Sequence, residues 1–288
     1  MVQPRSAMRR RIAPRPSLGA LWFVSSIGLL MGGQPVPIQI RQLDGLRGVQ
    51  LHGQNHPLFS ATLQSGRDTS GDSLLPYSVV IDNPTDFAII AYAVEWRGVD
   101  ASGKRIQHVL EYCDHRKLRA IPAHSRALLS MVAGLNVPGV KLSSKSVNHY
   151  LDIYSNAKSL EVSVDSLLFE DGSIAGPNAN QWMAFAIGSL RAERDVSNAV
   201  ANLPATASLE SLLQPWIQQA YAVVGPGYTD LPGLYRWARH ASSADDVYIA
   251  MRGHYAIELS NRSRQVGEAP TIDAVKRTRA TKVYPQFQ

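Results

Sequence analysis

The densest group of reactive side chains in this sequence is Cys113-Asp114-His115, which places a thiol, a carboxylate and an imidazole at consecutive positions. In an extended strand Cys113 and His115 would share one face and could supply two metal ligands. Zinc needs three or four converging ligands, and the nearest further histidines are His108 and His124. Cysteine–histidine nucleophilic catalysis would instead need the pair at hydrogen-bond distance. We expect no bound metal, and Cys113 and His115 are the candidate ligands if there is one; otherwise they end a strand and begin a loop.

A glycine-containing segment, residues 98–104, matches the first seven positions of a phosphate-binding loop and follows a predicted strand. The eighth position must be Ser or Thr to hold Mg²⁺, but here it is Arg105. The residues that follow alternate as a strand, so no helix N-terminus would face a phosphate. A hairpin turn centred on Ser102 and Gly103 explains the segment better.

Two other groups have the composition of metal sites. His52 and His56 have the i, i+4 spacing that binds metal on a helix, but a glycine inside the spacing and a proline directly after it argue against a helix. Glu170-Asp171-Gly172 could offer oxygen ligands to Ca²⁺ together with Asn178, but Asp-Gly is first of all a turn signal. We therefore expect a turn at Glu170-Asp171-Gly172 and no metal site at either place.

An aromatic set in the C-terminal half of the chain could line an apolar groove: Trp182, Trp216, Tyr221 and Trp237. At helical spacing such residues usually belong to the core. The sequence contains no Gly-x-Ser-x-Gly elbow, no His-Glu-x-x-His motif and no Gly-x-Gly-x-x-Gly motif. We expect no cofactor, and the catalytic residues, if there are any, are unknown.

Short strands with regular spacing are predicted between residues 58 and 172. Segment 87–96 is apolar on both faces, as in a central strand, because Ala88, Ile90, Tyr92, Val94 and Trp96 alternate with other apolar residues. About seven strands separated by turn signals predict an immunoglobulin- or fibronectin-III-like antiparallel β-sandwich. The remaining predicted strands are 74–81, 105–112, 125–132, 150–155 and 159–169.

Three segments resemble Ig-like domains of uncharacterised exported bacterial proteins. They are VVIDNPTDFAIIAYAVEW (79–96), DASGK (100–104) and IPAH (121–124). In those domains an Asn-bearing turn joins two strands, and a later Ile-Pro turn begins another. The segment LFEDGSIAGPN (168–178) resembles one near the end of such domains. The resemblance covers less than half of the chain and implies the β-sandwich fold, with no activity attached.

Helical periodicity replaces the strand pattern after Gly172. Asn178 is predicted to cap a first helix, with Gln181 at the third position of a capping box. Residues 209–221 predict a second, amphipathic helix that Pro215 should kink or restart. The fold class predicted is mainly β with an α-helical C-terminal part of two or three helices. The expected organisation is a leader (1–33), an extended linker (34–57), the sandwich (58–172), a helical region (173–260, ambiguous after 231) and a flexible basic tail (261–288).

The N-terminal segment predicts export. Arg9, Arg10, Arg11 and Arg15 precede an apolar run over 18–31, which is shorter than the ~20 residues that span a bilayer but typical of a signal peptide. No clean small-x-small cleavage site follows, so a membrane anchor formed by an uncleaved segment remains the alternative. We expect a signal peptide and a periplasmic or secreted protein.

The net charge of +6 is concentrated at the two ends of the chain. Without residues 1–33 the chain has 24 basic and 23 acidic residues, and residues 34–261 alone have 18 basic and 21 acidic residues. Nucleic-acid binding needs a concentrated basic face, so we exclude it for the body of the chain. Cys113, the only cysteine, cannot form an intramolecular disulfide, so the fold must depend on its core.

These observations favour an exported, non-catalytic β-sandwich protein that acts in binding or scaffolding at the cell envelope. Its partner would be another envelope protein, held through an edge strand or loops, and contact with a membrane would come only through an uncleaved N-terminal segment. A secreted hydrolase with a site between the sandwich and the helices is the first alternative. A carrier of a small ligand or lipid is the second.

Overall fold

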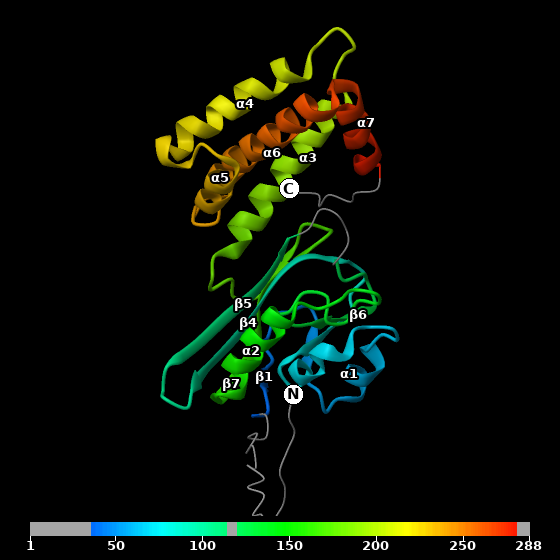
Figure 1. The fold of residues 1–288 in the computed structure, drawn as a ribbon, viewed down its shortest axis with the longest axis vertical. Helices are drawn as coiled ribbons and strands as arrows, with labels where there is room; N and C mark the ends of the chain where they lie inside the picture. The colour runs from blue at the N-terminus through cyan, green and yellow to red at the C-terminus, as the bar shows by residue number, and fades with distance from the viewer. Residues whose placement is uncertain (1–35, 114–119, 281–288) are drawn as a thin grey trace, which may run out of the picture. The chain divides into compact units, whose positions relative to one another are not determined.

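The computed structural model describes residues 36–113 and 120–280 (Figure 1). About 46% of these residues are helical and 23% lie in strands, which form two small open sheets. The prediction of a mainly β, Ig-like sandwich followed by two or three helices is therefore wrong, and the fold is a mixture of α and β. The leader (1–33) lies outside the described residues.

The larger sheet, sheet A, has the strand order β1-β7-β4-β5. Strand β1 (Gln39–Arg41) is parallel to β7 (Ala157–Phe169), and the other pairs are antiparallel. The long central strand β4 (Ile89–Asp100) is joined to β5 (Arg105–Cys113) by a hairpin, and the short β8 (Ile174–Ala175) pairs with the end of β7. β1 belongs to the segment predicted as a linker, which is thus partly built into the sheet.

The smaller sheet, sheet B, is antiparallel with the order β2-β3-β6. Its strands are β2 (Gln50–His52), β3 (Val79–Asn83) and β6 (Ser125–Leu129). Sheet B shares one hydrophobic core with the face of sheet A that we call the inner face, where Val94 and Trp96 are fully buried. The indole Nε1 of Trp96 donates to the carbonyl oxygen of Tyr77 at 2.9 Å, so this buried polar group is satisfied.

The opposite, outer face of sheet A packs against helices at one end. Ala91 and Ala93 of β4 share a second hydrophobic cluster with Trp182 and Ala186 of α3 (Trp182–Ala201) and Ala250 of α6 (Ala244–Val266). Because side chains alternate along a strand, β4 buries residues in both clusters. The prediction that β4 is apolar on both faces is confirmed over this part of the strand.

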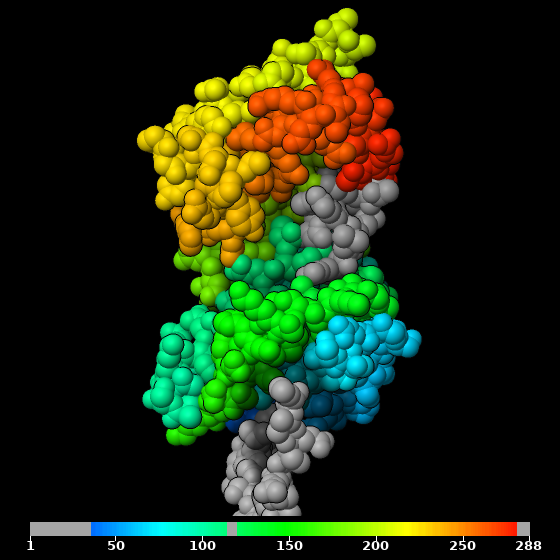
Figure 2. All heavy atoms as spheres, in the orientation of Figure 1, coloured from blue at the N-terminus to red at the C-terminus, as the bar shows by residue number. Residues whose placement is uncertain are grey.

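A third cluster lies between α3, α4 (Leu209–Val224), α6 and α7 (Glu268–Arg279). Helix α5 (Leu231–Ala238) packs in the second cluster instead, and the C-terminal helices form a continuous surface in the space-filling view (Figure 2). Helix α4 continues through Pro215. A 3₁₀ turn, η2 (Pro226–Tyr228), follows α4. No helix among the described residues is long and apolar enough to span a bilayer.

Two predictions of local structure are wrong. Segment 74–81 is not one strand: a 3₁₀ helix, η1 (Thr69–Tyr77), is capped by Asp68 and precedes β3. Segment 150–155 is the end of α2 (Ser144–Ser155), which the Ser143 hydroxyl caps. Short apolar runs do not distinguish a helical turn from a strand by period alone. Before them lies the short helix α1 (Pro57–Thr62).

The predicted flexible tail is largely helical up to Arg279. Gly267, at φ +93°, ends α6, and α7 begins at the next residue. The Glu268 carboxylate accepts from the backbone N–H of Leu209 at 2.6 Å, while Ile272 and Val275 pack on the third cluster. These tertiary contacts, rather than local propensity, hold α7 in place.

The two predicted turns are present. At the β4–β5 hairpin the Asp100 carboxylate accepts from the backbone N–H groups of Ser102 and Lys104, both at 2.9 Å, and Gly103 takes φ +85°. This is a hairpin turn and not a phosphate loop. At the β7–β8 turn Asp171 accepts from the N–H of Ser173 at 3.0 Å.

The contact between α4 and α6 predicts a stability effect. A Cβ added at Gly253 of α6 would overlap the Cβ of the fully buried Ala220 in α4. We expect Gly253→Ala to lower the free energy of unfolding by about 1–3 kcal/mol, because overpacking outweighs the gain in helix propensity. Ala220→Gly should partly rescue it, and Gly227→Ala, where a Cβ meets open space, should change little. Urea denaturation gives the free energy of unfolding of the unmodified protein, the two single variants and the rescue variant. An unchanged free energy of unfolding in Gly253→Ala would contradict the close approach of α4 and α6.

Candidate functional site

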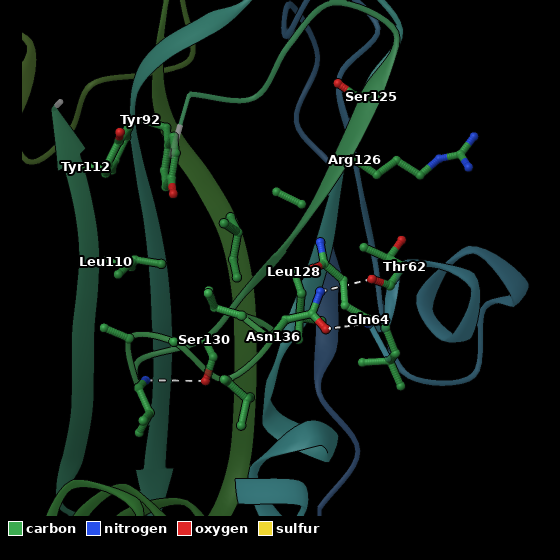
Figure 3. A pocket seen from close by; sticks show the side chains of 18 of the residues that line it. Thr62, Gln64, Tyr92, Leu110, Tyr112, Ser125, Arg126, Leu128, Ser130 and Asn136 are labelled. Atoms are coloured by element: carbon green, nitrogen blue, oxygen red, sulfur yellow. Dashed lines mark hydrogen bonds between the residues drawn. The ribbon is translucent and has the colours of Figure 1, made fainter. Parts of the chain in front are cut away.

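A groove of about 580 Å³ lies between β6 and the inner face of β4 and β5 (Figure 3). Five parts of the chain line most of it: the end of α1, the inner side chains of β4, those of β5, strand β6, and the loop 130–137. Tyr92, Leu110 and Tyr112 lie along one side in Figure 3, opposite Leu128, Ser130 and Asn136. The groove therefore forms where sheet B stops covering sheet A.

The sheet A side of the groove is apolar and firmly packed. Tyr92 and Tyr112 face each other in the β4–β5 register, and their rings stack with centroids 5.0 Å apart and an interplanar angle of 26°. Their side chains lie in the same core as Leu110. Stacked aromatic pairs of this kind make a rigid contact surface.

The opposite side is held in place by Asn136. Its side-chain oxygen accepts from the backbone N–H of Gln64, and its side-chain nitrogen donates to the carbonyl oxygen of Thr62, both at 2.9 Å. The dashed lines of Figure 3 show these two bonds. Asn136 thus ties the loop 130–137 to the end of α1 and fixes the width of the groove on that side.

Two edge strands border the groove. Strand β6 pairs only with β3, and β5 pairs only with β4, among the residues that the structure describes. Each therefore has one edge of backbone N–H and C=O groups without a strand partner in that part of the chain. Two basic side chains in or beside β6 contact carboxylates. Arg126 donates to Asp82 at 2.9 Å, and the His124 ring lies 2.9 Å from a carboxylate oxygen of Asp86.

Cys113 and the neighbouring His108 lie on opposite faces of sheet A. Cys113 is half-buried on the outer face of sheet A, with its Sγ 3.7 Å from the carbonyl oxygen of Ala186, whereas His108, an odd number of residues away, lies on the inner face. His115 lies outside the described residues. Within residues 36–113 and 120–280 no group of three His, Cys, Asp or Glu residues could hold a metal ion.

The two histidines do not share a helix, because His52 ends β2 and His56 caps α1. The His56 ring accepts from the backbone N–H of Leu58 at 3.2 Å and so caps α1. The rings of His52 and His56 stack with centroids 4.0 Å apart, and the buried His52 lies 3.8 Å from a carboxylate oxygen of Asp82. Burial, reinforced by His56, lowers the pKa of His52.

The oxygen-rich segment 170–178 has structural roles. The Asp171 carboxylate pairs with Arg47 at 3.0 Å besides closing its turn. Asn178 is not the N-cap residue of α3, because Gln181 occupies that position at φ +53°. The side-chain oxygen of Asn178 accepts from the backbone N–H of Met183. No calcium ligand set forms among these described residues.

The aromatic residues of the helical region belong to different clusters and do not line one groove. Trp182 is buried against sheet A, whereas Trp216 packs in the third cluster under the guanidinium of Arg252. Trp237 borders a separate hollow of about 620 Å³ with Tyr228. The expectation that the set forms mainly core agrees with this placement.

Comparison with models of protein families, with curated proteins and with solved structures finds no match for this chain. The resemblance to Ig-like domains of exported proteins stays a prediction. The groove was missed from the sequence because its residues come from five segments. The only local signal was the alternation that places Tyr92 on one face of its strand, and no spacing relates it to Asn136.

Removing the Asn136 amide should loosen the groove. We expect Asn136→Ala to lower the free energy of unfolding by about 1–2 kcal/mol, since two backbone groups lose their hydrogen-bond partner. Hydrogen exchange at the Gln64 amide should accelerate in the same variant. Asn55→Ala, at an exposed asparagine, is the matched control. Unchanged exchange at Gln64 would show that Asn136 does not hold the loop.

His108 should titrate below the usual range. Its Nδ1 lies 3.0 Å from the hydroxyl oxygen of Tyr154, and burial, followed by the nearby His149, lowers the pKa of His108 from 6.5. The unfolded chain therefore takes up this proton first, so the stability contributed here is present above pH ~6.5 and is lost as the pH falls through the folded-state pKa.

Imidazole NMR resonances measure this titration directly. We expect a midpoint below 6.5 for His108, and His149→Gln should raise it by removing a neighbouring positive charge. His240→Gln, at an exposed histidine on another element, should leave the midpoint unchanged. A midpoint at or above 6.5 would refute the burial of this ring.

Proposed function

We propose that this chain is an exported, non-catalytic binding protein whose groove between β6 and the β4–β5 hairpin takes an extended segment of a partner protein. The observation that carries the proposal is that both strands bordering the groove are sheet edges. An extended segment gains main-chain hydrogen bonds from such an edge and specificity from the pockets beside it. Export rests on the predicted leader alone.

The groove has the mixed character of a peptide site. Leu110 offers partly exposed apolar surface above the buried rings of Tyr92 and Tyr112, while Ser130 and Gln64 supply polar groups at the border of the groove. Alternate side chains of an extended peptide point to opposite sides, so one set would face Leu110 while the other points away from it. Neither β5 nor β6 contains a proline, one of the residues that protect sheet edges from pairing.

Fewer observations support the two alternatives, a hydrolase and a lipid carrier. A hydrolase between the sheets and the helices would need acid–base groups that converge on a cleft there, and Cys113 lies instead against the backbone of α3. A lipid carrier would need an enclosed apolar cavity, whereas the groove has polar groups such as Gln64 and Ser130 in its lining.

The proposal can be tested by selecting, from a library of displayed random peptides, those that bind the folded protein without its predicted leader. We expect enriched peptides with alternating apolar residues, and their binding should slow hydrogen exchange at the amides of Ser125–Leu129. Ala133 lines the groove and is exposed, so Ala133→Trp should fill it without disturbing the core. This variant should bind the peptides at least about tenfold more weakly, a loss of ~1.4 kcal/mol.

The control is Ala101→Trp, the same change at an exposed alanine in the β4–β5 turn, far along the strand from the groove. It should bind the selected peptides like the unmodified protein. Peptides that bind Ala133→Trp equally well, or no enriched peptide at all, would overturn the groove as a peptide site.

A further inference from the structure

A second, independent cavity lies on the outer face of sheet A beyond the end of the helices. The registers of β4, β5 and β7 show how that face changes along the strands. Cys113, Ala91 and Leu168 form an apolar row, whereas Gln107, Arg97 and Glu161 form a polar row with two charged members. Helices α3 and α6 cover only the apolar part. The second cluster contains no residue from the polar row of this face.

The cavity opens at a gap in the pairing of β7. Strand β1 pairs with Glu161–Ser163 and β8 pairs with Leu167–Leu168, so the residues between them have no strand partner on that edge among the described residues, although the backbone N–H of Asn178 donates to the carbonyl oxygen of Asp165 at 2.9 Å. The β4–β7 register also shifts between Ala93 and Val94, next to Asp165. Such irregularities re-aim side chains and often border sites. A cavity of about 610 Å³ occupies this gap, a size that suits a small ligand.

The floor of the cavity holds two buried carboxylates. Glu95, 1% exposed, accepts from Arg97 at 2.5 Å, from Gln107 at 2.7 Å and from Asn180 at 3.4 Å. Asp165, 3% exposed, accepts from the backbone N–H of Ala179 at 2.8 Å. Buried ion pairs seldom add to stability, so the Glu95–Arg97 pair is not explained by stability alone.

Arg97 connects the buried Glu95 with the cavity. Its guanidinium is fixed by Glu95, yet its side chain is 41% exposed and lines the cavity wall. Its Nε is buried and has no hydrogen-bond partner among the described residues. The guanidinium therefore keeps donor capacity that the fold does not use.

The chemistry of the lining selects for hydroxyl groups. Arg41 and Arg97 only donate hydrogen bonds and the exposed Asp44 only accepts them, while Glu95 and Asp165 are buried beneath and already accept from the fold. An anion would meet the carboxylate of Asp44 above two buried carboxylates, and a cation would meet two guanidiniums. A hydroxyl both donates and accepts, so a neutral ring with several hydroxyls satisfies both kinds.

The remaining wall is apolar. Ile174, which is 48% exposed, and the side chains of Leu43 and Pro177 border the same cavity. These side chains suit the C–H faces of a sugar ring, while the charged groups suit its edges. We propose that this cavity binds a neutral saccharide unit, an activity separate from peptide binding in the groove.

Titration with a panel of neutral monosaccharides, glucose, galactose and N-acetylglucosamine among them, tests the proposal by calorimetry and saturation-transfer NMR. We expect saturable binding of at least one with a Kd of about 1 mM, which is typical of a small, open site. Because the ligand is neutral, its Kd should change less than about twofold between low and high salt.

Variants at the mouth locate the site. Arg41→Ala and Asp44→Ala change exposed side chains, so both should fold, and each should weaken sugar binding about five- to tenfold. Arg105→Ala and Asp152→Ala remove the same charges at exposed positions elsewhere and should have no effect. Melting temperatures confirm that all four variants fold.

Three outcomes would overturn the proposal. They are the absence of saturable binding by any neutral sugar, binding that Arg41→Ala and Asp44→Ala leave unchanged, and binding of only the charged analogues glucosamine or glucuronate with strong salt dependence. Peptide binding to the groove does not enter any of these measurements, so the two proposals fail independently.

Discussion

The rest of the structure depends on the need of β4 to be covered on both faces. Both of its edges are paired, with β5 and β7, so its backbone is satisfied, and its alternating side chains enter two separate clusters. Large residues, Val94 and Trp96, face sheet B, whereas the small Ala91 and Ala93 face α3. Small side chains let a helix backbone approach the sheet closely. Sheet B and the α3–α6 pair are the two layers that this strand requires.

Both proposed sites lie where one of these two covers ends. On the inner face sheet B stops at β6, and the groove lies there, with the buried rings of Tyr92 and Tyr112 in its lining. On the outer face the helices stop after the alanines, and β4 continues with Glu95 and Arg97, which could not lie under an apolar helix without a large desolvation cost. The outward-facing residues of β4 thus change from apolar to charged at the point where the helices end.

Much of the framework was predictable because its signals are local. The continuous apolar run of β4 and the turn at Asp100 follow from alternation and turn chemistry, and α4 follows from a clear 3.6-residue period. The fold class was not predictable in this way, because α2 and η1 are short and begin with single capping residues, Ser143 and Asp68, inside segments that also fit a strand. Helix α7 depends on contacts with α4 that no local pattern contains.

The sites were harder to predict than the framework for a physical reason. Glu95 and Asp165 are far apart in the chain and meet only because a register shift in the β4–β7 pair places them at one gap in the sheet. A shift of a single residue would send every following side chain to the other face. An exposed charge and a buried charge look alike in a sequence, so the signal that distinguishes Glu95 from an ordinary surface residue is its three donors, which come from β4, β5 and the loop before α3. Buried charge with converging donors is a property of the register, and the register is what the sequence alone specifies least directly.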